Sequence, residues 1–264
     1  MTTVDDRVVH DAMAALAVPA PPSLAPSVLV EVGLADRYAR MDSPVGPLYV
    51  AWNGLGVSAV EAAPDDGTFE ARHVARTGRQ TLPAKTLPTS LASAIERRLG
   101  GDRRVQIALD WRGHTDFERD VWRKALEIPR GEVRPYGWIA AEIGRPRAVR
   151  AVGTALGHNP IPLIVPCHRV VRTDGSIGQY SLGGPENKRT ILAAEGLDPD
   201  AMEASARRGE RLVGSATTHI VCWPTCRTGR RMLPNNRRPF RSLADAAAAG
   251  YRPCKICRPV SVAA

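Results

Sequence analysis

The chain has 264 residues, 44% of them hydrophobic, with 36 Lys and Arg against 27 Asp and Glu. This length suits one large or two ordinary domains, and the apolar content excludes wholesale disorder. Its apolar runs fall far short of the roughly 18 residues that a membrane helix needs. The early Asp5 and Asp6 do not fit a secretory signal either. We therefore expect a cytoplasmic protein, monomeric and without a membrane partner.

The net charge of +9 favours a polyanionic partner such as nucleic acid. The excess is local, because residues 201–264 hold 12 Lys and Arg against 3 Asp and Glu, whereas residues 1–200 are balanced. The cysteines divide in the same way: Cys167 stands alone, and the other four lie in the basic C-terminal quarter. Since disulfides are rare in the cytoplasm, a metal site is the better explanation for these four.

The residue pattern changes near residue 37, from that of a flexible segment to that of a folded domain. We expect residues 1–36 to be a flexible leader, with a short helical piece at Asp5–Leu16 and a proline-rich stretch, Pro19–Pro26, that cannot hold a regular helix. From there the pattern becomes globular, and Asn53-Gly54 indicates the turn of a β-hairpin. The expected elements are hairpin strands at Leu48–Trp52 and Val57–Val60, a helix at Ser90–Leu99 and a strand at Val105–Trp111.

Helical patterns dominate the middle of the chain. An apolar stripe predicts a helix over Thr115–Leu126. Two short helical segments follow, Trp138–Ile143 and Arg147–Leu156, separated by Gly144-Arg145-Pro146. Such a pair resembles a helix-turn-helix, which presents its second helix to DNA. A plain pair of packed helices is the alternative.

After this pair of helices, the apolar segment Ile161–Val165 is expected to be buried, and it leads into Pro166–Val170. Pro185 and Gly196 are the start and stop signals of a helix over Glu186–Glu195. Small and charged residues over 198–214 indicate a linker.

Cys167 proves little by itself, because free cysteines are more often small buried hydrophobes than nucleophiles. A reactive cysteine needs an imidazole or a cation that lowers its pKa, and His168 and Arg169 supply both residue types. Neighbours in an extended segment point to opposite sides. Contact between Cys167 and His168 therefore requires a turn, or a bridging water that relays the proton.

Together, these residues resemble the active-site signature of the O6-alkylguanine-DNA alkyltransferases, the methylated-DNA–protein-cysteine methyltransferases. The likeness starts at Ser43–Gly46, includes Phe117–Trp122 and Tyr136–Leu156, and ends at Glu195-Gly196, so it covers about residues 40–196. It implies an α/β N-terminal subdomain over residues 37–112. It also implies a mostly helical catalytic subdomain with a helix-turn-helix over residues 113–198, followed by a linker over 199–214.

The resemblance implies DNA repair by direct, stoichiometric transfer of a methyl or alkyl group to Cys167. The substrate would be O6-alkylguanine in double-stranded DNA, with O4-alkylthymine as a further candidate, and the protein would lie on the nucleoid when bound. Because a thioether has no good route to hydrolysis, each molecule would act once, without an organic cofactor. A non-catalytic lesion sensor or transcription regulator is the alternative, which Cys167 disfavours because non-catalytic relatives lack this cysteine.

Roles follow from the resemblance position by position. His168 would act through a water as the base for Cys167, Glu195 would hold the imidazole, and Asn159 would stabilise the turn beneath the site. Tyr180 would hydrogen-bond the guanine and help to protonate it as it leaves.

Other positions would contact DNA. Arg150 would take the place of the flipped nucleotide, and Tyr136 would push on the adjacent phosphate. Arg147 would add a local positive charge. Small residues of the second helix, among them Ala151 and Gly153, would let it approach the minor groove closely.

The remaining cysteines form a CxxxC and a CxxC pair separated by 27 residues. Two such pairs suit a tetrahedral Zn²⁺ site, and a zinc ion that only holds a small domain together is one interpretation. The ligands would be Cys222, Cys226, Cys254 and Cys257.

Residues 215–264 also resemble the Ada-type metal-binding domain, a small α+β zinc domain. The matching pieces are Thr217–Cys222, Pro224–Cys226, Phe240 with Ala246–Gly250, and Tyr251–Lys255. The resemblance makes Cys222 a candidate second methyl acceptor, from phosphotriesters, as well as a zinc ligand. The surrounding arginines would bind DNA, with affinity that falls steeply with salt.

Two departures from the Ada pattern stand out. Trp223 occupies a position where arginine or another small or polar residue is common. In addition, the sequence ends seven residues after Cys257 and the domain order is reversed. Transcriptional activation through a following helix-turn-helix region is therefore not expected.

Overall fold

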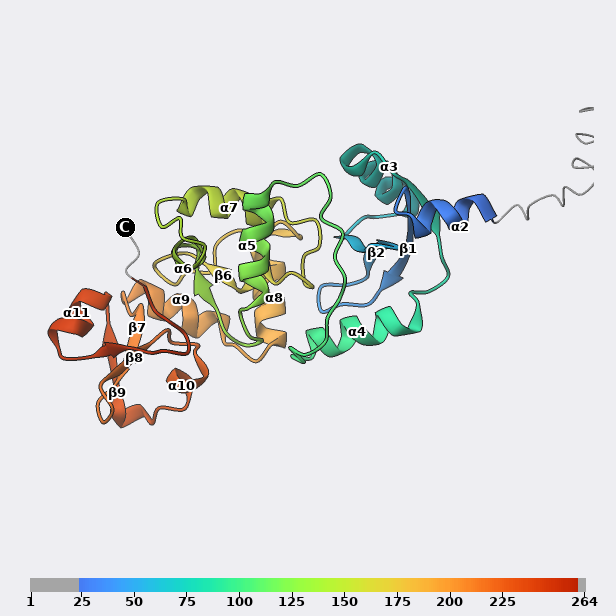
Figure 1. Ribbon diagram of the computed structural model, residues 1–264. Coiled ribbons are helices and arrows are strands. Elements are labelled where there is room, and N and C mark those ends of the chain that lie inside the picture. Colours follow the sequence, from blue (N-terminus) through green and yellow to red (C-terminus); the bar gives the residue numbers. More distant parts are fainter. Residues whose placement is uncertain (1–23, 261–264) are drawn as a thin grey trace, which may run out of the picture.

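The computed structural model describes residues 24–260. Its elements form three regions in a row, which follow one another along the chain (Figure 1). The helix expected at Asp5–Leu16 lies outside the described residues. Among the residues described, no helix is long and apolar enough to cross a membrane.

The N-terminal region is built on a four-stranded sheet in the order β3-β2-β1-β4. The β2–β3 hairpin confirms the predicted turn at Asn53-Gly54, and β1 pairs with β4 in parallel. The strands are β1 (Ala35–Met41), β2 (Leu48–Asn53), β3 (Gly56–Glu61) and β4 (Gln80–Pro83). The helices are α2 (Leu24–Glu31), α3 (Asp66–Thr77) and α4 (Thr89–Leu99), the last as predicted.

Two expectations for this region are wrong. Helix α2 includes Pro26, although the stretch through Pro26 was expected to exclude a regular helix. Proline is tolerated there because it lies in the first turn, where the amide has no partner within the helix. The segment 105–111 is not a strand either, since it makes only an isolated bridge from Leu109 to Val57.

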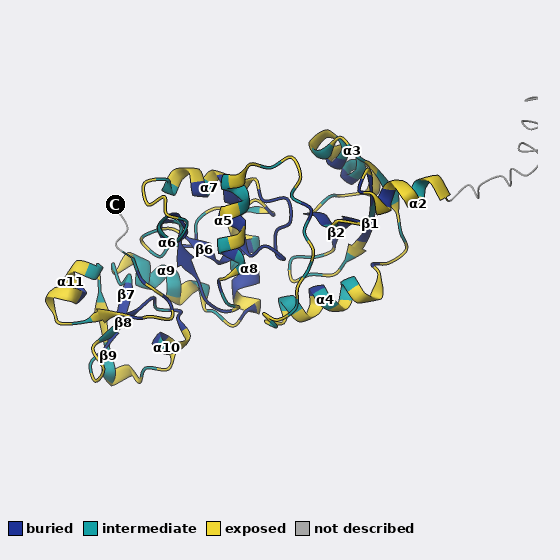
Figure 2. Ribbon diagram, in the orientation of Figure 1, coloured by how far each residue is buried: buried dark blue, intermediate teal, exposed yellow. Residues whose placement is uncertain are grey.

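The central region packs its helices around a continuous core (Figure 2). Thr115 and Glu118 form a capping box that starts α5, and the buried Trp122 donates its indole N–H to the Ala155 carbonyl at 2.8 Å. This bond fixes α5 against α7. The elements are α5 (Asp116–Leu126), β5 (Arg134–Pro135), α6 (Tyr136–Glu142), α7 (Val149–Gly157), the 3₁₀ turn η1 (Cys167–Arg169), β6 (Val170–Val171) and α8 (Gly184–Ala194).

The segment expected as a linker is instead a helix and the start of a strand. Asp198 accepts the amide of Ala201 at 2.9 Å and Pro199 opens the first turn, so α9 has a regular start. The C-terminal region has a sheet in the order β10-β8-β7-β9. Its elements are α9 (Pro199–Arg207), β7 (Leu212–Ser215), β8 (Ile220–Cys222), α10 (Arg227–Arg230), η2 (Pro234–Asn236), β9 (Arg237–Phe240), α11 (Leu243–Ala248) and β10 (Arg252–Pro253).

Candidate active site and metal centre

Cys167 lies at the first position of η1, directly after the buried segment 161–166, and is only 5% exposed. Asn159 organises this turn with three hydrogen bonds. Its side-chain amide donates to the Val165 carbonyl and to the Cys167 Sγ, each at 3.1 Å, and its Oδ1 accepts the Ile161 amide at 3.0 Å. Asn159 therefore contacts the thiol itself as well as the turn beneath it.

Opposing effects act on the pKa of the Cys167 thiol. Burial raises the pKa of Cys167, while the hydrogen bond from Asn159 and the positive charge of Lys188 act against this rise. Lys188 is itself buried in α8, where its Nζ donates to the Val170 carbonyl at 2.6 Å and burial lowers its pKa to about 8. Sequence reasoning missed Lys188. Its spacing from Ile191, Leu192 and Glu195 puts it on the buried stripe of the helix, which was an available signal.

His168 is oriented by Glu195, whose Oε1 lies 3.1 Å from the imidazole Nε2. A carboxylate acceptor at Nε2 favours the tautomer with the proton there, which leaves a lone pair on Nδ1. Nδ1 is buried and has no hydrogen-bond partner among the described residues. Burial lowers the pKa of His168, against the opposing effect of Glu195. The imidazole is thus a neutral base with one available nitrogen.

Glu195 is itself fixed from two further directions. Arg169 donates from Nη2 to Oε1 at 2.6 Å and from Nε to both carboxylate oxygens, and the Gly131 amide donates to Oε2 at 3.1 Å. Although burial opposes it, the hydrogen bonds and charges of His168 and Arg169 hold the pKa of Glu195 at about 2. From the sequence, Arg169 is expected only as a cation beside Cys167. Its partner is the carboxylate.

Two tyrosines, Tyr136 and Tyr180, lie near the Cys167 thiol. The buried Tyr180 ring lies edge-on to the His168 ring, with centroids 6.2 Å apart, and burial together with the nearby Cys167 raises its pKa well above the usual value. Tyr136, at the start of α6, lies against α7, where a Cβ added at Gly153 would come within 3.9 Å of its ring. Burial and the proximity of Cys167 also raise the pKa of Tyr136.

Helix α7 presents a face of small side chains to solvent. Val152, Ala155 and Leu156 are buried, whereas Arg150 and Ala151 are exposed and Gly153 is half-buried. Arg147, just before the helix, is also exposed. Arg147, Arg150 and Ala151 are therefore accessible to a partner, and Gly153 adjoins Tyr136.

The four remaining cysteines meet in the C-terminal region, with their ligand atoms within 4.8 Å of one another and all four residues buried. Tetrahedral zinc with Zn–S bonds near 2.3 Å places its sulfurs roughly 3.8 Å apart. The spacing and the all-thiolate donor set of Cys222, Cys226, Cys254 and Cys257 therefore fit a zinc ion. No other cluster of three or more such ligands occurs within residues 24–260.

Comparison with known proteins agrees with this geometry. The family model for the 6-O-methylguanine DNA methyltransferase DNA binding domain matches residues 116–197, and that for the metal binding domain of Ada matches residues 201–260. The methylated-DNA–protein-cysteine methyltransferase of Mycobacterium tuberculosis is 39% identical over 167 residues, which are 60% of this chain and 92% of that protein.

Two further likenesses extend the comparison. The protein of the same name from Salmonella typhimurium is 36% identical, over 60% of this chain and 94% of its own length. The crystal structure of a variant of the M. tuberculosis O6-methylguanine methyltransferase matches with a TM-score of 0.50 and 36% identity, over 61% of this chain and 92% of the other. The chain therefore belongs to the methylated-DNA–protein-cysteine methyltransferase family, whose members repair DNA by alkyl transfer to a cysteine, and it carries an Ada-type metal-binding domain.

Proposed function

We propose that Cys167 is the acceptor of the alkyl group and that its substrate is O6-alkylguanine in double-stranded DNA. One observation carries this assignment. Among the cysteines within residues 24–260, Cys167 is the one that is followed by a proton acceptor, His168. Glu195 holds His168 through Nε2, which leaves Nδ1 for proton transfer. The four other cysteines have one another as neighbours.

The chemistry needs no cofactor at this site. The thiol proton passes to His168 Nδ1 through a water, and the developing imidazolium is stabilised by the Glu195 carboxylate. The thiolate attacks the alkyl carbon, so that a C–S bond forms as the C–O6 bond breaks. The electron pair leaves with the guanine, which takes up a proton with the help of the Tyr180 hydroxyl. The thioether is stable, and each molecule acts once.

Access to the lesion requires DNA distortion, since an alkyl group on a stacked base cannot be reached in the duplex. We assign α6 and α7 to a helix-turn-helix whose second helix enters the minor groove. The small exposed side chains of α7 permit close approach, Arg150 fills the space left by the extruded nucleotide, and Tyr136 contacts the neighbouring phosphate.

The metal centre would hold Zn²⁺ through its four thiolates, and a bound zinc would keep those thiols deprotonated and cross-link the small domain. Transfer of a methyl group from a phosphotriester to Cys222 stays a prediction. Cys222 is completely buried, so such transfer would require that its sulfur be uncovered.

A peptide-mapping experiment tests the assignment. Stoichiometric incubation with duplex DNA that contains O6-methylguanine should add one methyl group to the peptide with Cys167, and Cys167→Ala should abolish repair. Undiminished repair by Cys167→Ala would contradict the proposal. DNA binding without any transfer would favour the lesion-sensor alternative, and phosphotriester DNA in the same assay would report on Cys222.

A further inference from the structure

The first cysteine pair of the metal centre is attached to the central region. Thr225, between Cys222 and Cys226, accepts the Val133 amide at 2.9 Å through Oγ1 and donates its hydroxyl to the Val133 carbonyl at 3.4 Å. The Arg227 amide, directly after the pair, donates to the Glu132 carboxylate at 2.9 Å. Residues 129–134, here named the supporting loop, thus bind the backbone and side chains of the metal-binding turn.

The second cysteine pair is attached as well, to α6. Arg258, the residue after Cys257, donates from Nε to the Glu142 carboxylate at 2.9 Å, and its guanidinium lies 5.9 Å from the centre of the Trp138 ring. Its amide donates back to the Cys254 carbonyl at 2.9 Å. A metal bound by both cysteine pairs would therefore fix the contact with the supporting loop and the contact with α6 at the same time.

The supporting loop reaches the active site from its other side. Gly131 donates its amide to Glu195 Oε2 at 3.1 Å, two residues before the Val133 amide that binds Thr225. Gly131 has φ of +70°, and a Cβ there would come within 3.0 Å of the Glu195 carbonyl oxygen. The loop is tightly fitted against Glu195, so displacement of Val133 would also displace the Gly131 amide.

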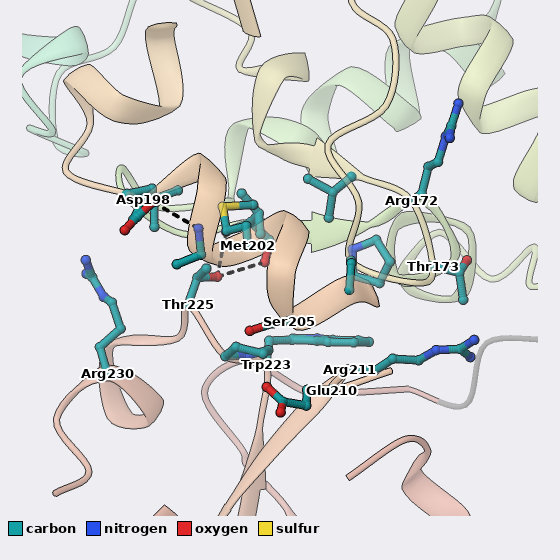
Figure 3. A pocket seen from close by; sticks show the side chains of 18 of the residues that line it. Arg172, Thr173, Asp198, Met202, Ser205, Glu210, Arg211, Trp223, Thr225 and Arg230 are labelled. Carbon is teal, nitrogen blue, oxygen red and sulfur yellow. Dashed lines mark hydrogen bonds between the residues drawn. The ribbon is translucent and has the colours of Figure 1, made fainter. Parts of the chain in front are cut away.

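Apolar side chains do not fill the space between the supporting loop and the metal-binding turn. A cavity of about 370 Å³ lies between the supporting loop, α9 and the metal-binding turn. Figure 3 looks into it and shows Trp223, Thr225 and Met202 around its walls. Because atoms across a cavity lose their contacts, the hydrogen bonds of Thr225 and Arg227 provide the attachment on this side. Trp223, which departs from the Ada pattern, covers one wall.

We infer that Thr225 and Glu132 are positioning residues for alkyl transfer, and that zinc at the four cysteines holds the supporting loop so that Glu195 is aligned with His168. The inference rests on the proposed role of Cys167. Neither residue touches the substrate. They act through the Gly131 amide, which carries one of the contacts that orient the Glu195 carboxylate.

Substitution of Thr225 in the zinc-loaded full chain tests the inference. Thr225→Val keeps the shape and loses both hydrogen bonds, Thr225→Ser keeps the hydroxyl, and the exposed Thr218→Val is the matched control. The single-turnover rate constant at saturating O6-methylguanine duplex should fall about tenfold in Thr225→Val, because small misplacements near a reacting group are costly. Thr225→Ser should restore it, and Thr218→Val should match the wild type.

A second readout separates positioning from simple stability. The pH profile of iodoacetamide modification at Cys167, followed by peptide mass, should shift to higher pH in Thr225→Val. Zinc removal from the wild type should produce the same shift and should increase amide hydrogen exchange in the supporting loop. At the other attachment point, the exposed Arg258→Gln should lower the rate constant in the same direction by a smaller factor.

The outcomes are distinguishable. An unchanged rate constant and pH profile in Thr225→Val, even with a lower melting temperature, would overturn the inference. Absence of methyl on Cys167 of the wild type would instead overturn the proposed function. If Thr225→Val binds zinc poorly, Thr225→Ser and Arg258→Gln decide the question. A wild-type rate constant in Arg258→Gln, together with unaltered amide hydrogen exchange on zinc removal, would then also contradict the inference.

Discussion

Cys167 and the four cysteines of the metal centre are buried to a similar degree, yet their neighbours differ in kind. Beside the Cys167 sulfur, the Asn159 amide donates a hydrogen bond and Lys188 supplies a positive charge, and both favour a thiolate. Around Cys222 lie three other sulfurs. Burial alone therefore says little about what a cysteine does. What distinguishes the two kinds of site is the polar and charged groups beside each sulfur.

The strongest test of this comparison exchanges one cysteine of each kind for alanine. Cys167→Ala should abolish transfer with little loss of stability, because a single small side chain is removed. Cys254→Ala should lose zinc and unfold the C-terminal region, since structural zinc contributes on the order of 10 kcal/mol. Zinc content, limited proteolysis and methyl transfer measure these effects. Stoichiometric zinc and full protease resistance in Cys254→Ala would break the distinction.

A second test concerns the carboxylate that only the Cys167 site has. Glu195→Gln should slow transfer about 100-fold, because the imidazolium loses its stabilising charge. It should also destabilise the fold by about 3 kcal/mol, since the buried Arg169 loses its charged partner. Single-turnover kinetics and urea unfolding at pH 7 measure the two losses. A variant with wild-type kinetics would remove Glu195 from the mechanism.

The same residue predicts a pH dependence of stability. Its pKa is about 2 in the folded protein against an ordinary value of 4.5. The contribution is therefore fully present above pH 4.5 and is lost as the pH falls towards 2, by about 3 kcal/mol in all. Urea unfolding of the wild type and of Glu195→Gln at pH 5 and pH 3 should show a smaller loss in the variant. Equal losses would mean that other carboxyl groups dominate.

The smallest expected effect concerns charge. Replacing the exposed Arg231, Arg238 and Arg241 by Gln should weaken DNA binding and reduce the slope of log K against log salt by up to about 3, if each contacts a phosphate. The rate constant at saturating DNA should stay the same. Arg104→Gln, at an exposed position of the N-terminal region, is the control. An unchanged slope in the triple variant would place the electrostatic attraction elsewhere.

The sequence predicted those parts of the fold that local pattern decides. The hairpin, α4, α5 and the α6–α7 pair follow from turn residues and apolar periodicity, and the Cys167 signature follows from a resemblance. Helix α9 was missed because small and charged residues suit both a linker and an exposed helix, and only Asp198 and Pro199 signalled a start. The segment 105–111 has strand-like residues but almost no strand partner.

The site was predictable to the extent that its residues lie in the signature. Arg169 contacts Glu195, and Lys188 contacts the Val170 carbonyl, through hydrogen bonds between segments that lie apart in the sequence. Helical spacing places Lys188 on the buried stripe of α8, but it reveals neither of these partners. The attachment of Thr225 to Val133 joins residues 92 positions apart. Neither side chain is unusual in its own segment, and only the folded arrangement brings them together.

Helix α9 and the cavity beside it have a consequence for fragments of this protein. A chain cut before Pro199 would turn Val133, Pro135 and Val171, which line the cavity, towards water. It would also leave the Glu132 and Arg134 ion pair at a new surface without the Arg227 amide. An apolar patch with a charged rim favours self-association. The central region made alone would therefore tend to dimerise through a surface that the whole protein keeps covered.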